Sequence, residues 1–417
     1  MIEDSRSETA VPKNRTRSNP TRTTVIALVF INFSLSLGYG VVNPFFPLYL
    51  NRHGADGLSI GFFFCIYSLA KIVFGPIIGR LSDRWDRRVL LLSGLFLYSL
   101  ISLFYLTSSH LSVLLLVRFL QGIGAATVRP IAMAFIAELA PRKQEGLMMA
   151  TYDIAFYAAL GVGPMIGGVV FDTWSAKGVF ACLVCLCLGA LLSGILFVRG
   201  NPVCSAAKRS GAVNCDIFVS SKFLALAVFI FGRAAGVAVL AAFAPLFLGL
   251  RCNFSGSRIG ILIASTTLVT ALLLRPTGRL STRIDPRRLV MFGGTGCALL
   301  IFLIPLYREF WHMLLLFMGI GLFAAVSFPS SVVLLAREGE RFGMGLTMGL
   351  FNSAMNMGFL FGMLLGGMIL KIAGMSAVFY AAGLGGGLGT LVFGHYSRAG
   401  GPAKRFSNQS VVHAEPS

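Results

Sequence analysis

The stretch Gly79-Arg-Leu-Ser-Asp-Arg-Trp-Asp-Arg-Arg88 is a short, arginine-rich turn between two long apolar runs. A near copy, Gly278-Arg-Leu-Ser-Thr-Arg-Ile-Asp-Pro-Arg-Arg288, begins 199 residues later and also separates two apolar runs. A similarity that returns at a fixed offset indicates an internal repeat. These two turns therefore predict a chain of two similarly organised halves.

The composition of the chain is that of a membrane protein. Of its 417 residues, 56% are hydrophobic and only 12% are charged, and the mean hydropathy is +0.80. A soluble domain carries about 25% charged residues. We therefore expect an integral membrane protein, and we read the net charge of +19 as a consequence of membrane topology and not of nucleic-acid binding.

The basic residues alternate between the two sides of the predicted membrane. Of the 35 Lys and Arg residues, 25 fall on one side, six on the other and four within apolar runs. An excess of Lys and Arg marks the cytoplasmic side. This rule places both termini in the cytoplasm, and we expect a multi-pass protein of a bacterial cytoplasmic (inner) membrane.

Twelve apolar runs are long enough to cross a bilayer, which takes about 20 mostly apolar residues in a helix. They are 24–49, 58–79, 89–107, 111–137, 147–171, 178–198, 222–249, 258–277, 289–306, 311–336, 343–371 and 377–396. We expect an all-α protein with six-helix bundles at 23–198 and 222–397, joined by a polar cytoplasmic linker at 199–221. Residues 1–22 and 398–417 are predicted to be disordered cytoplasmic tails.

The two halves match at many positions besides the opening turn. At the offset of 199 residues, Gly122 matches Gly321, Pro130 matches Pro329, and Gly167-Gly168 matches Gly366-Gly367. In the first span the offset is one residue shorter, so that Pro47 matches Pro245. Because six spans separate the copies, the halves have the same orientation. Parallel six-helix halves are a transporter design, with substrate bound between them near the membrane midplane.

Four motifs, each in its proper span, resemble those of the major facilitator superfamily and, within it, the twelve-span drug:proton antiporters. The resemblance covers residues 24–396 and implies the major facilitator fold, two pseudo-symmetric bundles of six transmembrane helices. The four motifs are the turn from Gly79 to Arg88 with Asp86 where a glycine is usual, Leu37 to Pro47 in the first span, Leu114 to Ala126 in the fourth, and Gly163-Pro164-Met-Ile-Gly167-Gly168 in the fifth.

The loop motif implies a cytoplasmic latch between the halves. By resemblance, Asp83 accepts hydrogen bonds from the start of the eleventh span near Gly343, where the helix dipole favours an anion. Arg87 would pair with Glu138 at the end of the fourth span. The alternative is that the turn only sets topology. The predicted latch comprises Gly79, Asp83, Arg84, Arg87, Arg88 and Glu138.

The fifth-span motif is typical of exporters by the same resemblance. Gly163 and Gly167 are spaced so that another helix can approach closely. Pro164 lacks a backbone donor and is expected to bend the helix. Gly163, Pro164, Gly167 and Gly168 are the predicted antiporter motif, and a plain packing seam is the alternative.

Charged side chains inside a membrane are costly and usually functional. Five lie within the spans away from their ends: Lys71, Arg118, Arg129, Asp153 and Arg233. Counted from the cytoplasmic ends of their helices, Lys71, Arg129 and Asp153 lie at similar depth. We therefore predict that Asp153 bridges Lys71 or Arg129, either as a structural salt bridge or as a functional pair.

Asp153 is the only acid within a span, and it is the leading candidate for proton coupling. Arg118 matches the arginine that the resemblance links to the same role. The four intramembrane bases favour an anionic substrate or co-ion. The predicted substrate cavity comprises Lys71, Arg129, Arg233, Asn32, Tyr157, Asn352 and Asn356.

These observations predict a proton-coupled efflux antiporter of small organic molecules that works by alternating access. One alternative is an organic-anion exchanger or symporter, and another is a transport-inactive sensor or assembly partner. An enzyme is not expected, because the spans hold no nucleophile–base pair or metal-ligand cluster. The expected partners are a small-molecule substrate, protons and lipid, with no cofactor, no metal and no nucleic acid, and the expected state is a monomer.

Overall fold

The computed structural model describes residues 18–82, 85–139, 145–198 and 220–398, with no description of a few further side chains, Glu138 and Thr282 among them. Almost all of this part of the chain is helical. The first-half helices are α1 (Ser18–Val42), α2 (Phe46–Arg52), α3 (Gly57–Ser82), α4 (Arg87–Thr107), α5 (Leu111–Leu139) and α6 (Glu145–Phe197). The second-half helices are α7 (Ser221–Leu250), α8 (Gly256–Arg283), α9 (Pro286–Leu303), α10 (Phe310–Phe342), α11 (Met344–Ala373) and α12 (Met375–Arg398), and single 3-10 turns lie at Asn43–Phe45 and Ile304–Leu306.

The first span, which the sequence predicts as one run, is not a continuous helix in the structure. It is interrupted near its end. Helix α1 stops at Val42, the turn Asn43–Phe45 follows, and α2 carries the chain to Arg52. Prolines explain the interruption, because Pro44 and Pro47 have no amide hydrogen to donate to a helical carbonyl. The sequence predicts a disordered tail at residues 1–22. In the structure α1 begins at Ser18, so residues 18–22 are helical and this part of the prediction is wrong.

Helix α6 crosses the membrane twice. Its 53 residues contain one non-helical residue, Ser175, with φ 58° and ψ −166°. Thr24, early in α1, donates a hydrogen bond to Phe197 O at the end of α6, whereas Asn32, further along α1, bonds to Tyr152 O near its start. The two parts of α6 therefore run in opposite directions along α1. Among the described residues, eleven helices are long and apolar enough to span a bilayer, and with this reversal they make the twelve predicted crossings.

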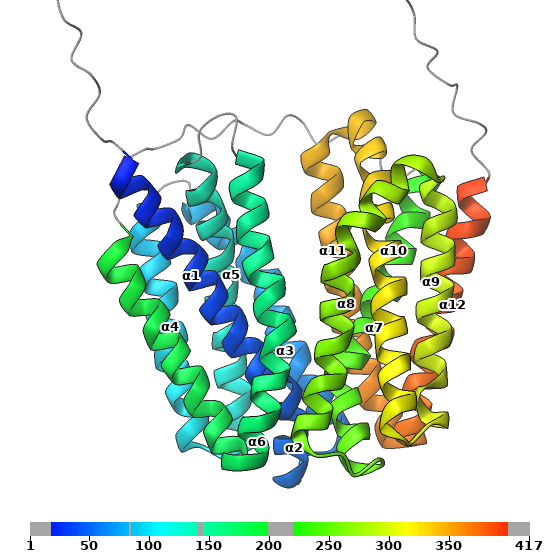
Figure 1. The fold of residues 1–417 in the computed structure, drawn as a ribbon, viewed down its shortest axis with the longest axis horizontal. Helices are drawn as coiled ribbons and strands as arrows, with labels where there is room; N and C mark the ends of the chain where they lie inside the picture. The colour runs from blue at the N-terminus through cyan, green and yellow to red at the C-terminus, as the bar shows by residue number, and fades with distance from the viewer. Residues whose placement is uncertain (1–17, 83–84, 140–144, 199–219, 399–417) are drawn as a thin grey trace, which may run out of the picture.

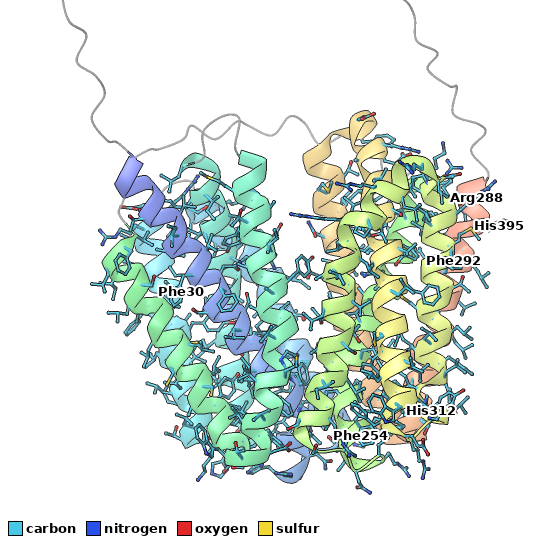
Figure 2. All side chains as sticks on the ribbon, in the orientation of Figure 1. Phe30, Phe254, Arg288, Phe292, His312 and His395 are labelled. Atoms are coloured by element: carbon cyan, nitrogen blue, oxygen red, sulfur yellow. The ribbon has the colours of Figure 1, made fainter. Side chains whose placement is uncertain are left out.

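The twelve crossings form two helical bundles that lie side by side (Figure 1). Their interiors are filled with apolar side chains, and large apolar side chains also cover their outer faces. Phe292 on α9 and Phe30 on α1 are 63% and 47% exposed (Figure 2). Apolar groups outside as well as inside are expected where lipid replaces water as the solvent.

The bundles approach each other at the edge where α2 lies and diverge at the edge where α1 begins and α12 ends (Figure 1). Glycines allow the approach. A Cβ atom on Gly61 of α3 would meet the backbone of Met363 and Gly367 on α11, and one on Gly260 of α8 would meet the backbone of Pro164 on α6. The structure is therefore closed at one edge and open at the other.

Candidate substrate cavity

A cavity of about 280 Å³ lies among the helices of the first half. All but one of its wall residues come from α1, α3, α4, α5 and α6, and the second half contributes one side chain, from α11. The wall comprises Asn32, Leu35, Ser36, Tyr39, Tyr67, Lys71, Tyr98, Ala125, Val128, Arg129, Tyr152, Phe156, Leu160 and Phe359. The wall thus combines aromatic rings with two cations, Lys71 and Arg129.

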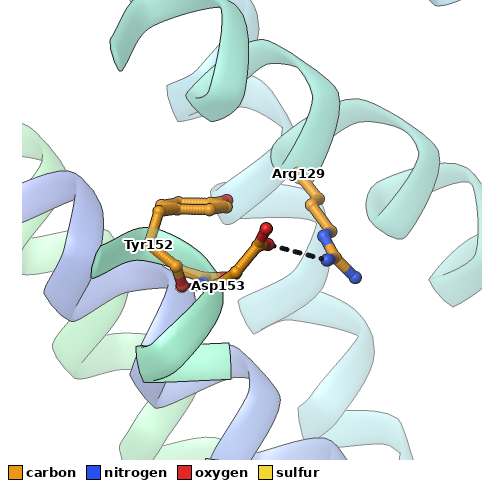
Figure 3. Close-up of polar contacts among 4 residues, drawn as sticks. Arg129, Tyr152 and Asp153 are labelled. Carbon is orange, nitrogen blue, oxygen red and sulfur yellow. Dashed lines mark hydrogen bonds and ion pairs between the residues drawn. The ribbon is translucent and has the colours of Figure 1, made fainter. Parts of the chain in front are cut away.

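The predicted bridge between Asp153 and a cation is present, and the cation is Arg129. Arg129 Nη2 donates to Asp153 Oδ1 at 3.4 Å, from α5 to α6 (Figure 3). The Arg129 guanidinium also lies 3.8 Å from the centre of the Phe156 ring. The two side chains are 41% and 45% exposed, so this is a half-open ion pair beside the cavity and not a sealed one. A pair at this distance and exposure can open and reform at modest cost.

Lys71 reaches the same cavity from α3 but has a different environment. Its Nζ lies 5.5 Å from the centre of the Tyr67 ring. Among the described residues, it has no carboxylate within ion-pair distance. The cavity therefore holds one cation with an acidic partner and one without.

Arg118 does not line this cavity but is buried beside it, with 1% of its surface exposed. It donates to Gln121 Oε1 and to Asn43 Oδ1, both at 2.8 Å. Five aromatic rings, those of Tyr39, Phe46, Phe63, Phe64 and Tyr67, lie within 5.8 Å of its guanidinium carbon. Neutral amides and rings hold this charge, which ties α5 to the turn after α1.

The other predicted cavity residues have varied positions. Asn32 lines the cavity and is 5% exposed, and its amide donates to Tyr152 O at 2.8 Å. Arg233 lies in a separate, smaller pocket of the second half. Tyr157, Asn352 and Asn356 are not in the wall of the first-half cavity.

The predicted latch falls partly outside the described residues. Asp83 and Arg84 are among the undescribed positions, as is the side chain of Glu138. Arg88 Nη2 donates to Ile195 O at 3.4 Å within the first half, and its backbone amide donates to Oδ1 of Asp86, the N-cap of α4, at 2.7 Å. The bundles stand apart at the edge where this turn lies (Figure 1). The latch stays a prediction for the state in which that edge closes.

The glycines of the fifth-span motif pack α6 against both halves. Cβ atoms on Gly163 and Gly167 would meet the α1 backbone at Gly40 and Val41, and one on Gly168 would meet Gly256 of α8. The helix continues through Pro164, because the one non-helical residue of α6 is Ser175. The motif is thus a seam at which α6 touches α1 and α8, and its exporter role stays a prediction.

Two polar contacts between the halves were not foreseen. The Asp172 carboxylate on α6 accepts hydrogen bonds from Gly256 N, Ser257 N and Ser257 Oγ at 2.6, 2.8 and 2.6 Å. These donors form the first turn of α8, where an anion is favoured. Lys371 on α11 pairs with Asp56, the residue before α3, at 3.2 Å. Both contacts lie at the closed edge.

These two contacts are related by the repeat, and the repeat could have revealed them. Asp172 matches Lys371 at the offset of 199, and Asp56 matches Ser255, which caps α8. The sequence therefore places an acid in one half and a base in the other at equivalent helix ends. Hydrogen bonds from Ser59, followed by the contact with Lys371, lower the pKa of Asp56 to about 2.

Two parallel helical bundles, with a cavity that holds charged side chains and with one open edge, are the architecture of a membrane transporter. The family model described as Major Facilitator Superfamily matches residues 28–255 and 223–414. The chain belongs to this family, and it is a non-enzymatic secondary transporter that resembles the drug:proton antiporters, as predicted.

Relatives and solved structures agree with this assignment. The chain is 26% identical over 363 residues to the uncharacterized MFS-type transporter MJ1560 of Methanocaldococcus jannaschii, covering 85% of this chain and 93% of the relative. It is 25% identical over 385 residues to the multidrug resistance protein MdtG of Proteus mirabilis, covering 87% and 93%. The crystal structure of a variant of the nucleoside transporter NupG superposes with a TM-score of 0.77 at 12% identity, covering 89% and 99%.

Proposed function

We propose that this transporter is a proton-coupled efflux antiporter of small organic molecules, with Asp153 as the coupling group. The observation that carries the proposal is the half-exposed pair of Asp153 and Arg129 beside the first-half cavity. Asp153 is the one acid within the predicted spans away from their ends, so it is our candidate for a carboxylate that stores a proton in the membrane interior.

The orientation of the protein in the membrane follows from the charge pattern. The positive-inside rule assigns the edge with the termini to the cytoplasm. The bundles diverge at this edge (Figure 1), so the conformation is the inward-open one of the proposed cycle. Alternating access then requires the contacts at the other edge to break, Asp172 with α8 and Asp56 with Lys371 among them.

Coupling in an antiporter requires that proton and substrate exclude each other. A substrate amine near Asp153 favours the ionised carboxylate, and protonation of the carboxylate removes the charge that holds the amine. The same protonation releases Arg129 from its 3.4 Å contact. The half-open geometry of the pair supports this exchange, because the Arg129 and Asp153 side chains are 41% and 45% exposed.

The wall of the cavity supports aromatic substrates with charged groups. Tyr39, Tyr67, Tyr152 and Phe156 offer ring faces, Lys71 and Arg129 can hold an acidic group, and Asp153 can hold an amine. The relative MdtG of Proteus mirabilis is a multidrug resistance protein, and a cavity of this kind is suited to drug-like zwitterions.

Lys71 favours a second candidate function, the transport of organic anions. Among the described residues no carboxylate pairs with Lys71, so this cation is available to an acidic substrate. An anion that takes Arg129 from Asp153 would raise the proton affinity of the carboxylate. Proton and anion would then bind together, which gives symport and not antiport.

The sign of the proton movement separates the two functions. The purified protein would be reconstituted into liposomes with a pH dye inside, and norfloxacin, ethidium and benzoate added one at a time. Antiport predicts that inward substrate flux drives proton efflux, whereas symport predicts proton influx with benzoate. Exchange predicts benzoate flux that needs an internal anion and moves no protons. Asp153→Asn should remove the coupled proton movement, and Asp86→Asn, which alters an acid outside the spans, is its matched control. No flux with any of the three compounds would contradict both transport proposals and favour a sensor.

A further inference from the structure

A second, smaller pocket of about 40 Å³ lies within the second half. Its wall contains one charged side chain, Arg233 of α7, among small or apolar residues. Glycines make up four wall positions, Gly232, Gly236, Gly294 and Gly386, and Cys297, Ser327 and Thr390 supply the other polar atoms.

This pocket is related by the repeat to part of the substrate cavity. Five of its sixteen wall positions match positions of the larger cavity at the offset of 199, or 198 in the first span. The matched pairs are Leu35 with Arg233, Tyr39 with Val237, Tyr98 with Cys297, Ala125 with Ala324, and Val128 with Ser327. In the first half the cations come from α3 and α5, whereas in the second half a cation comes from α7. Smaller side chains replace tyrosines at two matched positions, so the second pocket keeps a positive charge without the aromatic wall.

Arg233 has no acidic or hydrogen-bonding partner in the described part of the chain. Its Nε is buried and unpaired, and its nearest favourable contact is the face of the Phe328 ring, 4.8 Å away. No acid lies within the spans of the second half away from their ends. A cation without a counter-charge is costly at this depth. Arg118, the buried arginine of the first half, has two amide partners instead.

We propose that the Arg233 pocket binds one small anionic group. The guanidinium supplies the charge, and its unpaired Nε–H supplies a donor. The four glycines leave room beside it, and the volume limits the occupant to a monatomic anion or a single carboxylate. The Arg233 site is separate from the Arg129–Asp153 pair, so the second half has an anion site of its own.

Two kinds of ligand could supply the anionic group. One is a free inorganic anion such as chloride, and the other is the acidic end of a transported molecule. All of the pocket's wall residues belong to the second half, so a substrate acid that reaches Arg233 would be held there by the second half alone.

Anion-dependent thermal stability of the purified full chain tests the site without any transport assay. Sodium gluconate, whose anion exceeds the pocket volume, would be replaced stepwise by sodium chloride or sodium acetate at constant ionic strength. We expect a saturable rise in melting temperature of about 2–4 °C. Chloride alone acting identifies an inorganic ion as the source, and acetate competing with chloride identifies a carboxylate.

Variants then assign the effect to this pocket. Arg233→Gln should abolish the anion-dependent rise, Arg233→Lys should keep part of it, and Lys71→Gln should keep all of it. Gly386→Ala, which fills the pocket, should raise the anion concentration needed for half of the stabilisation at least tenfold. The neighbouring Gly387→Ala should leave this concentration unchanged. In both glycines an added Cβ meets only Ala298 Cβ, at 3.6 and 3.9 Å, so both variants should fold. An anion response that persists in Arg233→Gln, or that is absent from the wild type, would overturn the proposal.

Discussion

Asp172 and Ser257, which belong to opposite halves of the protein, are joined by two hydrogen bonds, from the Ser257 amide at 2.8 Å and from its hydroxyl at 2.6 Å. Together with the bond from Gly256 N, they cap the first turn of α8 with a carboxylate from α6. The contact closes one edge of the transporter, and it must break if that edge is to open.

Replacing Asp172 by Asn should shift the protein toward the state in which this edge is open. The variant loses a charge that faces three donors at a helix start, and such bonds contribute about 1.5–3 kcal/mol. The open population should therefore rise about tenfold or more. Spin labels at Lys177 and Arg308, on opposite halves, would report longer distances in a background without reactive cysteines. An unchanged distance distribution would show that the cap does not hold the edge.

The contact of Lys371 with Asp56 should persist under mildly acidic conditions. The pKa of Asp56 is lowered to about 2, so the ionised carboxylate stabilises the closed edge above its ordinary pKa of about 3.8. This contribution is lost only as the pH falls from about 4 through about 2. Label distances in the Asp172→Asn background should therefore be the same at pH 7 and pH 5. A difference in label distance between pH 7 and pH 5 that disappears in Lys371→Met would contradict this assignment.

Gly260→Ala should prevent the two halves from closing at this edge. An added Cβ would meet the backbone carbonyl of Pro164 across the interface, and backbone cannot move aside as a flexible side chain can. We expect a lower melting temperature and longer distances between the same labels. Gly278→Ala on the same helix is the matched control, since a Cβ there meets no atom within 4 Å. Equal behaviour of the two variants would rule out a steric role.

Arg118→Lys should destabilise the first half. Lysine keeps the charge but cannot direct two planar N–H groups to Gln121 and Asn43 at once. Loss of one such bond to a buried partner costs about 1–3 kcal/mol, measured as a lower unfolding midpoint. Arg129→Lys, at a half-exposed site, should cost less. Equal stability of the two variants would show that the hydrogen bonds of buried Arg118 contribute no more to stability than the contacts of half-exposed Arg129.

Much of the fold could be predicted from the sequence, because membrane spans and repeats leave strong patterns. The apolar runs located the helices. Gly61 and Gly260 are also related by the offset of 199, and they lie where α3 and α8 each contact a helix of the other half. The break after Val42 was missed, although Pro44 and Pro47 were its visible signal.

The site could be predicted only in part, because depth in the membrane does not fix the direction of a side chain. Counting residues brought Asp153 and Arg129 to the same layer, and the structure joins them. The same counting could not show that Arg233 lies in its own pocket, since that depends on how α7 rotates against α9, α10 and α12. Asp172 was overlooked because it lies just beyond a span, where an acid looks unremarkable until its partner helix is known.

The central claim is that Asp153 couples substrate movement to protons, and Asp153→Asn tests it most directly. Proteoliposomes would be assayed for norfloxacin exchange at equal pH and for norfloxacin accumulation driven by a pH gradient. Asparagine keeps the size of the side chain but cannot bind or release a proton in the pH range of the assay. The proposal predicts that exchange persists while gradient-driven accumulation and the accompanying proton flux are lost. Accumulation at the wild-type rate in Asp153→Asn would contradict it.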